Sequence, residues 1–310
     1  MKRVVVSEFL PDVYLELLRS RYQVIYDPDL YGDRPRLLGE VGDAEAILIR
    51  NRTRIDHELL GAARSLRVVG RLGVGLDNID MEGCARLGVG VIPAVGANAV
   101  SVAEYVMGAM LVLTRGVYAM TSSMVAGEWP RQGHAFGREL SGKTLGLVGL
   151  GSIAREVALR ADSFAMRVVA HDPLLPGDHP VWDTVGRVDL ETLLSAADVV
   201  SLHVPLDDGT RNLIDATALS LMKPTAILVN TSRGGTVDEA ALADALRNGR
   251  IGGAALDVFA SEPLGPEPAA TFAGLTNLLL TPHVAGNTEE SVDRVAKMIV
   301  DAVIDDLERT

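Results

Sequence analysis

Short runs of valine, isoleucine and leucine alternate with amphipathic segments along the chain, and this alternation constrains the fold more than any other feature. Up to about residue 95 the apolar runs are KRVVVSEF, YQVIYDP, EAILIRN, LRVVGRLG and VGVIPAV, and helical patterns such as PDVYLELLRSR follow several of them. Strand and helix patterns in alternation are typical of βα units around a parallel sheet. The first part of the chain is therefore predicted to be one α/β domain.

A second series of strand patterns begins at Lys143. Its apolar runs are KTLGLVGL, RVVAHDP, ADVVSLHVP, TAILVNTS, GAALDVFA and NLLLTPH, with helical patterns between most of them. Such near-continuous apolar runs are expected where a sheet is covered on both faces. Because 310 residues correspond to about two domains, the sequence predicts an α/β protein with two Rossmann-like or flavodoxin-like parallel-sheet domains.

Two segments separate the series and a third ends the chain. SVAEYVMGAMLVLTRGVY contains Glu104 and Arg115 and is too polar for a membrane span, so we expect a linking helix. Residues 120–141 lose the periodicity and are predicted to form an irregular arm, with Trp129 as its packing anchor. The last segment, TEESVDRVAKMIVDAVIDDLERT, is predicted to be an amphipathic helix capped by Thr288.

Charge and cysteine content narrow the class of protein. A net charge of −12 argues against a nucleic-acid or anionic-membrane partner. The first residues contain only a short apolar run, which is neither a signal peptide nor a membrane span. Cys84 is the only cysteine, so it has no disulfide or metal-site partner of its own kind and is expected to be a core residue. We expect a cytoplasmic protein without a bound metal or a membrane partner.

A glycine-rich turn follows the strand pattern KTLGLV and points to a dinucleotide. It contains Gly149, Gly151 and Ala154 in the spacing GxGxxA, and a helical pattern opens behind it. Glycines at such a turn let the backbone approach a pyrophosphate, whose charge is met by the helix N-terminus. Asp172 ends the next strand pattern, where a carboxylate would bind the ribose hydroxyls, and no arginine beside it could receive a ribose phosphate. NAD is therefore the predicted cofactor.

Three polar residues follow strand patterns in the second series: Arg233, Glu262 and His283. The carboxyl ends of parallel strands lie at one edge of a sheet, so the three are expected to converge. A histidine can transfer a proton, a glutamate can hold its tautomer, and an arginine can bind a carboxylate through two hydrogen bonds. Beside a nicotinamide, these groups suit hydride transfer between an alcohol and a carbonyl. Each residue alone has a purely structural alternative, as a turn histidine, a surface glutamate or an ion-paired arginine.

Five motifs resemble those of the D-isomer-specific 2-hydroxyacid dehydrogenase family, nearest to its phosphoglycerate-dehydrogenase-like branch. They are GRLGVGLDNID (Gly70–Asp80), GLGSIA (Gly149–Ala154), NTSRGGTVDEAAL (Asn230–Leu242), ALDVFASEP (Ala255–Pro263) and LTPHVAGNT (Leu280–Thr288). The resemblance covers essentially the whole chain. It implies an NAD-dependent oxidoreductase that transfers hydride between nicotinamide and a D-2-hydroxy acid or 2-oxo acid.

The same resemblance assigns individual residues. It implies that Arg233 binds the substrate carboxylate and carbonyl, that Glu262 supports the histidine and that His283 is the acid/base. The backbone amides of Val74 and Gly75 are implied to bind the carboxylate as well. The residues implied to bind NAD are Gly149, Gly151, Ser152, Ile153, Asp172, Val204, Thr231, Asp257 and Gly286.

Domain boundaries also follow from the resemblance. Residues 1–98 and 288–310 would form a discontinuous substrate domain, residues 99–287 an NAD-binding Rossmann domain, and a cleft would lie between the two. The arm at about 120–141 resembles the dimerisation arm of the family and implies a homodimer. Longer phosphoglycerate dehydrogenases continue into regulatory modules, so regulation of that kind is not expected in a chain that stops at Thr310.

A second anion pocket is suggested by the segment that follows the strand pattern EAILI. Arg50 and Arg52 flank Asn51 and, being two positions apart, could face the same way, and Arg71 could join them. Such arginines are similar to those of phosphoglycerate dehydrogenases, and a three-carbon acid with a phosphate or sulfonate, such as 3-phosphoglycerate or 3-sulfolactate, would use them. The alternative is that they form surface ion pairs with some of the 41 carboxylates.

Three other functions stay open at this point. A hydroxypyruvate or glyoxylate reductase of the same family would need no second anion pocket. A non-catalytic NAD(H)-sensing regulatory protein would keep the fold and act through a partner. Chemistry of the formate dehydrogenase kind would place a glutamine beside the histidine, and Glu262 argues against it.

Overall fold

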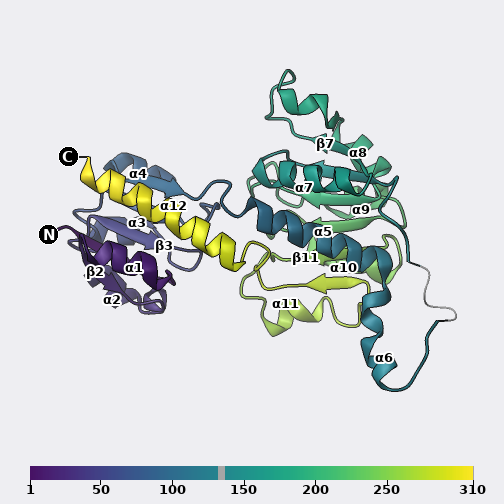
Figure 1. The fold of residues 1–310 in the computed structure, drawn as a ribbon, viewed down its shortest axis with the longest axis horizontal. Coiled ribbons are helices and arrows are strands. Elements are labelled where there is room, and N and C mark those ends of the chain that lie inside the picture. The colour runs from purple at the N-terminus through teal and green to yellow at the C-terminus, as the bar shows by residue number, and fades with distance from the viewer. Residues whose placement is uncertain (132–136, 310) are drawn as a thin grey trace. The chain divides into compact units, whose positions relative to one another are not determined.

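The computed structural model describes residues 1–131 and 137–309, so residues 132–136 of the expected arm and Thr310 lie outside the described residues. The backbone divides into two compact units (Figure 1). Unit 1 comprises Met1–Asn98 and Asn287–Thr310, and unit 2 comprises Ala99–Gly286. Each unit has its own parallel sheet with helices on both faces, which confirms the predicted fold class.

Unit 1 has a five-stranded sheet in the order β2-β1-β3-β4-β5, and every neighbouring pair is parallel. Its strands are β1 (Arg3–Val6), β2 (Gln23–Tyr26), β3 (Ala46–Ile49), β4 (Val68–Arg71) and β5 (Gly90–Pro93). Every residue of β3 and β4 is buried. This burial explains why the central strands read as unbroken apolar runs rather than as alternating patterns.

Helices cover both faces of this sheet. They are α1 (Asp12–Arg19), α2 (Arg34–Glu40), α3 (His57–Ala62), α4 (Met81–Leu87) and α12 (Glu289–Glu308), with a short 3-10 turn η1 (Leu30–Gly32). α12 packs on β4 because Gly70 has no side chain: a Cβ there would come within 2.8 Å of Ile299 and 2.9 Å of Val303. The Thr288 side chain accepts a hydrogen bond from the Ser291 amide and caps α12, as predicted.

Unit 2 has a seven-stranded parallel sheet in the order β12-β11-β10-β9-β6-β7-β8. Its strands are β6 (Thr144–Val148), β7 (Arg167–His171), β8 (Gly186–Arg187), β9 (Val199–Leu202), β10 (Ile227–Asn230), β11 (Gly253–Leu256) and β12 (Leu278–Leu280). The chain runs outward from β6 to β8 and then crosses to β9 on the other side of β6. Ligands bind in open α/β sheets at such a switch point, beyond the carboxyl ends of the strands.

The helices of unit 2 are α5 (Ala99–Arg115), α6 (Thr121–Val125), α7 (Ser152–Ser163), α8 (Leu190–Ala196), α9 (Ala216–Leu221), α10 (Glu239–Arg247) and α11 (Pro266–Ala270), with 3-10 turns η2 (Val117–Met120) and η3 (Pro180–Asp183). Buried residues of α5 and α7 form one core with the sheet, and those of α8, α9 and α10 form the core on its other face. Within the described residues, no helix is both long and apolar enough to cross a membrane.

The arm differs from its prediction in two respects. A short helix, α6, interrupts the segment that was expected to be irregular throughout. Trp129 is 75% exposed, so the expectation that it anchors the arm by packing is wrong for this chain by itself. Val125 is 84% exposed as well, and α6 buries none of its residues.

Candidate active site

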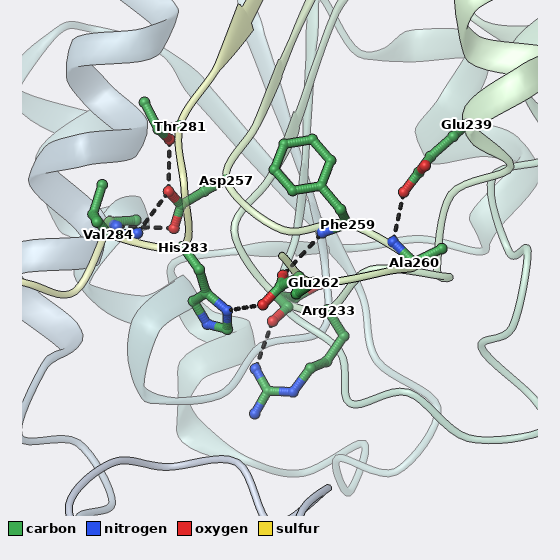
Figure 2. Close-up of polar contacts among 11 residues, drawn as sticks. Arg233, Glu239, Asp257, Phe259, Ala260, Glu262, Thr281, His283 and Val284 are labelled. Atoms are coloured by element: carbon green, nitrogen blue, oxygen red, sulfur yellow. Dashed lines mark hydrogen bonds and ion pairs between the residues drawn. The ribbon is translucent and has the colours of Figure 1, made fainter. Parts of the chain in front are cut away.

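The predicted catalytic residues follow three neighbouring strands of unit 2. Arg233 lies beyond β10, Glu262 beyond β11 and His283 beyond β12, and these strands are adjacent in the sheet. Figure 2 shows the three side chains close to one another, with the imidazole and the guanidinium projecting to the same side of the loops. The predicted convergence is therefore present in the structure.

A short hydrogen bond joins the histidine to the glutamate. His283 Nδ1 lies 2.7 Å from Glu262 Oε2, and the other carboxylate oxygen, Oε1, accepts a hydrogen bond of 3.0 Å from the Phe259 amide. Burial raises the pKa of Glu262, but the hydrogen bonds from His283 and Phe259 and the charges of His283 and Arg233 outweigh burial and lower it. The carboxylate is therefore ionised at neutral pH and accepts the Nδ1 proton, which leaves Nε2 as the nitrogen that faces away from Glu262.

The backbone at His283 has an unusual conformation that its surroundings maintain. Its φ of 56° lies in the left-handed region, which a residue with a Cβ rarely adopts. The His283 amide donates to the carbonyl oxygens of Asp257 at 2.8 Å and Thr281 at 3.1 Å. Because strained backbone persists only where neighbouring contacts fix it, these bonds set the position of the imidazole.

Asp257 holds the same loop through its side chain. It is 1% exposed, and its carboxylate accepts hydrogen bonds from Thr281 Oγ1 at 2.6 Å, Val284 N at 2.9 Å and Ala285 N at 2.8 Å (Figure 2). The family resemblance pointed to Asp257 as an NAD contact. In the structure both of its carboxylate oxygens bind the loop that carries His283.

Arg233 is held by its own turn and by close packing of two loops. Asn230, which the sequence did not single out, is 1% exposed and donates from Nδ2 to the Arg233 carbonyl at 3.0 Å. A Cβ at Gly234 would lie 1.8 Å from the carbonyl oxygen of Phe259, so the turn after β10 touches the backbone of the loop that carries Glu262. The distance between Arg233 and Glu262 therefore depends on a glycine at position 234.

The glycine-rich turn has the geometry that a dinucleotide requires. Gly149 has a φ of +86°, and a Cβ there would meet the His203 carbonyl oxygen at 2.6 Å. Gly151 precedes the first residue of α7, and a Cβ built on it has no neighbour within 4 Å, so open space lies in front of the helix N-terminus. This arrangement fits a pyrophosphate, with Ser152 and Ile153 forming the first turn of α7.

Other predicted NAD-binding residues surround this turn. Asp172 accepts a hydrogen bond of 2.8 Å from the Leu150 amide, which places its carboxylate beside the glycine-rich loop. The Val204 side chain packs against Gly149, since a Cβ there would lie 3.1 Å from its Cγ1. The hydroxyl of Thr231 is buried without a hydrogen-bond partner among the described residues. An unsatisfied buried hydroxyl is costly, so Thr231 suits the polar edge of a bound cofactor. Gly286 follows the loop that Asp257 holds.

In unit 1 the two arginines that were expected to face the same way contact different neighbours. Arg52 donates to the Tyr31 hydroxyl and stacks 5.0 Å above the Tyr31 ring. Arg50 Nη2 lies 3.5 Å from Asn287 Oδ1. Burial lowers the pKa of the Arg50 guanidinium, and the charge of Glu8 opposes that shift. The two-residue alternation holds only within a strand, and β3 ends at Ile49. Asn51, between them, is exposed.

Arg71 contacts the turn of Val74 and Gly75, which is expected to bind the substrate carboxylate. Arg71 is 8% exposed and donates from Nε to the Gly75 carbonyl oxygen at 2.8 Å. A Cβ at Gly73 would come within 2.3 Å of the Arg71 guanidinium, so a side chain there would have to displace the end of Arg71. Arg71 therefore supports the turn that contains Val74 and Gly75. No cluster of histidine, cysteine and acidic residues suited to a metal ion occurs in the described parts of the chain.

Comparisons with known proteins agree with the family that the sequence motifs resemble. The family model described as D-isomer specific 2-hydroxyacid dehydrogenase, NAD binding domain, matches residues 107–285. A relative named (S)-sulfolactate dehydrogenase from Chromohalobacter salexigens is 50% identical over 304 residues, which are 98% of this chain and 97% of the relative. A hydroxypyruvate reductase from Thermotoga maritima is 37% identical over 306 residues, 98% of each chain. The structure of D-lactate dehydrogenase from Aquifex aeolicus, complexed with NAD and lactic acid, has a TM-score of 0.83 and 27% identity, and the match covers 98% of this chain and 96% of that one.

Proposed function

This chain belongs to the D-isomer-specific 2-hydroxyacid dehydrogenase family, and from that premise we propose which residues carry out its NAD-dependent oxidation or reduction of a hydroxy acid. His283 is the general acid/base, Glu262 orients it, and Arg233 binds the substrate carboxylate. The observation that carries this proposal is the 2.7 Å contact between His283 Nδ1 and Glu262 Oε2, with Arg233 beside the pair. Turnover of a 2-oxo acid with NADH, compared between wild type and His283 variants, tests it.

The proton transfer follows from the tautomer that Glu262 imposes. Because the carboxylate accepts the Nδ1 proton, Nε2 is the atom that exchanges a proton with the substrate oxygen. In reduction, protonated His283 donates to the carbonyl oxygen, and in oxidation neutral His283 accepts the hydroxyl proton. Arg233 provides two parallel donors for the carboxylate, which fixes the reacting carbon. Bound NAD supplies or accepts the hydride.

The residues proposed to hold NAD are those around the glycine-rich turn and the strand ends. Gly149, Gly151, Ser152 and Ile153 would bind the pyrophosphate, and Asp172 the ribose. Val204, Thr231, Asp257 and Gly286 would lie along the nicotinamide half. The buried hydroxyl of Thr231, which has no hydrogen-bond partner in the described part of the chain, supports this assignment. The engagement of Asp257 with its own loop supports a role through the position of that loop.

Asp172 leads to a prediction about cofactor preference. We expect the catalytic efficiency with NADH to exceed that with NADPH by at least about tenfold, because placing like charges together costs several kcal/mol and about 1.4 kcal/mol is a factor of ten. Steady-state kinetics with both cofactors at one 2-oxo acid concentration measure the ratio. The Asp172→Asn enzyme should show a smaller ratio. Equal efficiency with the two cofactors in the wild type would mean that Asp172 does not bind the ribose.

For the substrate we propose a three-carbon acid with a second anionic group, a sulfonate or a phosphate. The relative that is 50% identical is named for a sulfonated hydroxy acid. Arg50 has the chemistry to bind such a group, because its side chain is only partly exposed and its described side-chain partner is the neutral amide of Asn287. Arg52 is stacked on Tyr31, so we assign it a peripheral part in the same site, together with Asn51.

The two arginines offer a matched comparison. Arg50→Gln is expected to lower the catalytic efficiency for 3-sulfopyruvate by roughly ten- to 150-fold, the effect of losing about 1.5–3 kcal/mol of charged hydrogen bonding. Arg52→Gln should cost less, and hydroxypyruvate kinetics should change little in either variant. If both acids lose efficiency equally, Arg50 does not bind the second anion. A wild type that prefers hydroxypyruvate would favour the alternative named for the Thermotoga relative.

We propose that the protein is a homodimer located in the cytoplasm, and the two proposals rest on different observations. A homodimer formed through the arm would cover Val125 and Trp129, which are 84% and 75% exposed in this chain. The net charge of −12 argues against a nucleic-acid partner, and the single buried cysteine suits the reducing cytoplasm. Sedimentation of the purified protein measures the oligomeric state.

A further inference from the structure

Glu8 is a buried carboxylate that the proposed reaction does not use. It lies two residues beyond β1 in unit 1 and is 4% exposed. Burying a carboxylate is costly unless hydrogen bonds satisfy it. The hydrogen bonds that Glu8 accepts offset this cost and indicate what the carboxylate does.

Three backbone amides of a single loop donate to Glu8. Its Oε1 accepts from Arg50 N at 2.7 Å and from Thr53 N at 3.0 Å, and its Oε2 accepts from Arg52 N at 3.2 Å. Hydrogen bonds to an ionised acceptor are about twice as strong as neutral ones. One carboxylate therefore fixes the backbone of residues 50–53, the loop that begins directly after β3.

The same loop is also held through its carbonyl oxygens. Asn78 Nδ2 donates to the carbonyl oxygens of Arg50 at 3.0 Å and Thr53 at 2.6 Å. The hydroxyls of Ser7 and Thr53, both buried, lie 2.8 Å apart. The loop is thus held through its amides by Glu8 and through its carbonyls by Asn78.

The oxygens of Glu8 bind backbone rather than the Arg50 guanidinium. Among the ion pairs of the described residues, none joins Glu8 to Arg50. The negative charge nevertheless lies close enough to oppose the effect of burial on the Arg50 pKa. Glu8 therefore favours the charged form of Arg50 without occupying its donors.

We propose that Glu8 is a positioning residue that holds loop 50–53 so that Arg50 is preformed to receive the second anionic group of the substrate. The inference rests on the proposed function for that substrate group. Glu8 would act through the loop rather than by contact with the substrate, because its two oxygens are engaged by the loop amides. Its effect should therefore appear in the binding of a doubly charged acid and only weakly in the chemical step.

The test is Glu8→Gln, which keeps the shape of the side chain but removes its charge and replaces one acceptor by a donor. We expect the KM for 3-sulfopyruvate to rise by about tenfold or more, the effect of losing charged hydrogen bonds. The kcat and the KM for hydroxypyruvate should change little. Glu16→Gln, which removes the same charge from an exposed site on α1, is the matched control and should behave as wild type. Thermal unfolding checks that each variant is folded.

A double-mutant cycle separates positioning from a general loss of structure. In the Arg50→Gln background, Glu8→Gln should add little to the KM for 3-sulfopyruvate, because both changes act through one loop. Additive effects, an equal rise of KM for hydroxypyruvate, or an unchanged KM would overturn the inference. Should Glu8→Gln fail to fold, Glu8→Asp retains the charge but shortens its reach, and an intermediate KM is then expected, whereas wild-type kinetics would overturn the inference.

Amide hydrogen exchange makes the inference testable apart from the substrate. In Glu8→Gln, the amides of Arg50, Arg52 and Thr53 should exchange faster, while those of β6 in unit 2 should not change. Unchanged exchange in the loop would contradict the role of Glu8. If the wild type shows no preference for 3-sulfopyruvate, the proposed substrate is wrong, and the exchange result alone then decides whether Glu8 holds the loop.

Discussion

The His283→Ala enzyme is expected to lose about a hundredfold or more in kcat, the usual share of a general acid/base. The Glu262 carboxylate would remain, but no group at the position of Nε2 could exchange a proton with the substrate oxygen. The affinity for NADH should be retained, because the glycine-rich turn and Asp172 belong to other loops. Steady-state kinetics with a 2-oxo acid and a fluorescence titration with NADH measure the two quantities.

His57→Ala is the matched control for this change. His57 is exposed at the start of α3 in unit 1, so its loss should leave kcat at the wild-type value. A His283→Ala enzyme with unchanged kcat would remove His283 from the proposed reaction. A variant that also lost NADH affinity would indicate that the loop after β12 had rearranged.

Gly234→Ala is expected to lower kcat/KM by about a hundredfold, although it adds only a methyl group. The new Cβ would lie 1.8 Å from the Phe259 carbonyl oxygen and 2.5 Å from the Ala260 amide nitrogen, and both are backbone atoms that cannot rotate away. The loops after β10 and β11 would have to separate, which would move Arg233 away from Glu262. A misplacement of about 1 Å in a catalytic group can cost that factor.

Gly108→Ala provides the control within the same unit. Gly108 lies inside α5, and a Cβ built there has no neighbour within 4 Å. Alanine at this helical position should leave kcat/KM unchanged and raise stability slightly, since glycine is the weaker helix former. Near-wild-type kcat/KM in Gly234→Ala would show that the two loops can separate without disturbing the site.

Patterns of local sequence were sufficient to predict much of the fold. Buried parallel strands have continuous apolar runs, so β3, β4 and β10 could be recognised, and the Thr288 cap followed from the acidic first turn of α12. β8 has only two residues and leaves no apolar run to recognise. The exposure of Trp129 was missed because a large aromatic residue has the same sequence signature whether it packs within its own chain or remains exposed.

Site residues that follow strand ends could be predicted from the sequence. Residues whose position depends on contacts with distant parts of the chain could not. Topology places Arg233, Glu262 and His283 at one edge of the sheet, and the structure brings them together there. The role of Glu8 could not be predicted. Its carboxylate accepts a hydrogen bond from the Arg50 amide, which is 42 positions away, and no local pattern links the two residues. The divergence of Arg50 from Arg52 depends likewise on Tyr31 and Asn287, which lie far from the loop in sequence.

The most direct test of the proposed function is the oxidation of NADH by the wild-type protein with 3-sulfopyruvate and with hydroxypyruvate. We predict that the absorbance of NADH falls in step with formation of the 2-hydroxy acid, and that kcat/KM is higher for 3-sulfopyruvate. Binding of NADH without turnover of either acid would contradict the assignment of His283, Glu262 and Arg233 to catalysis and would favour an NAD(H)-sensing regulatory protein.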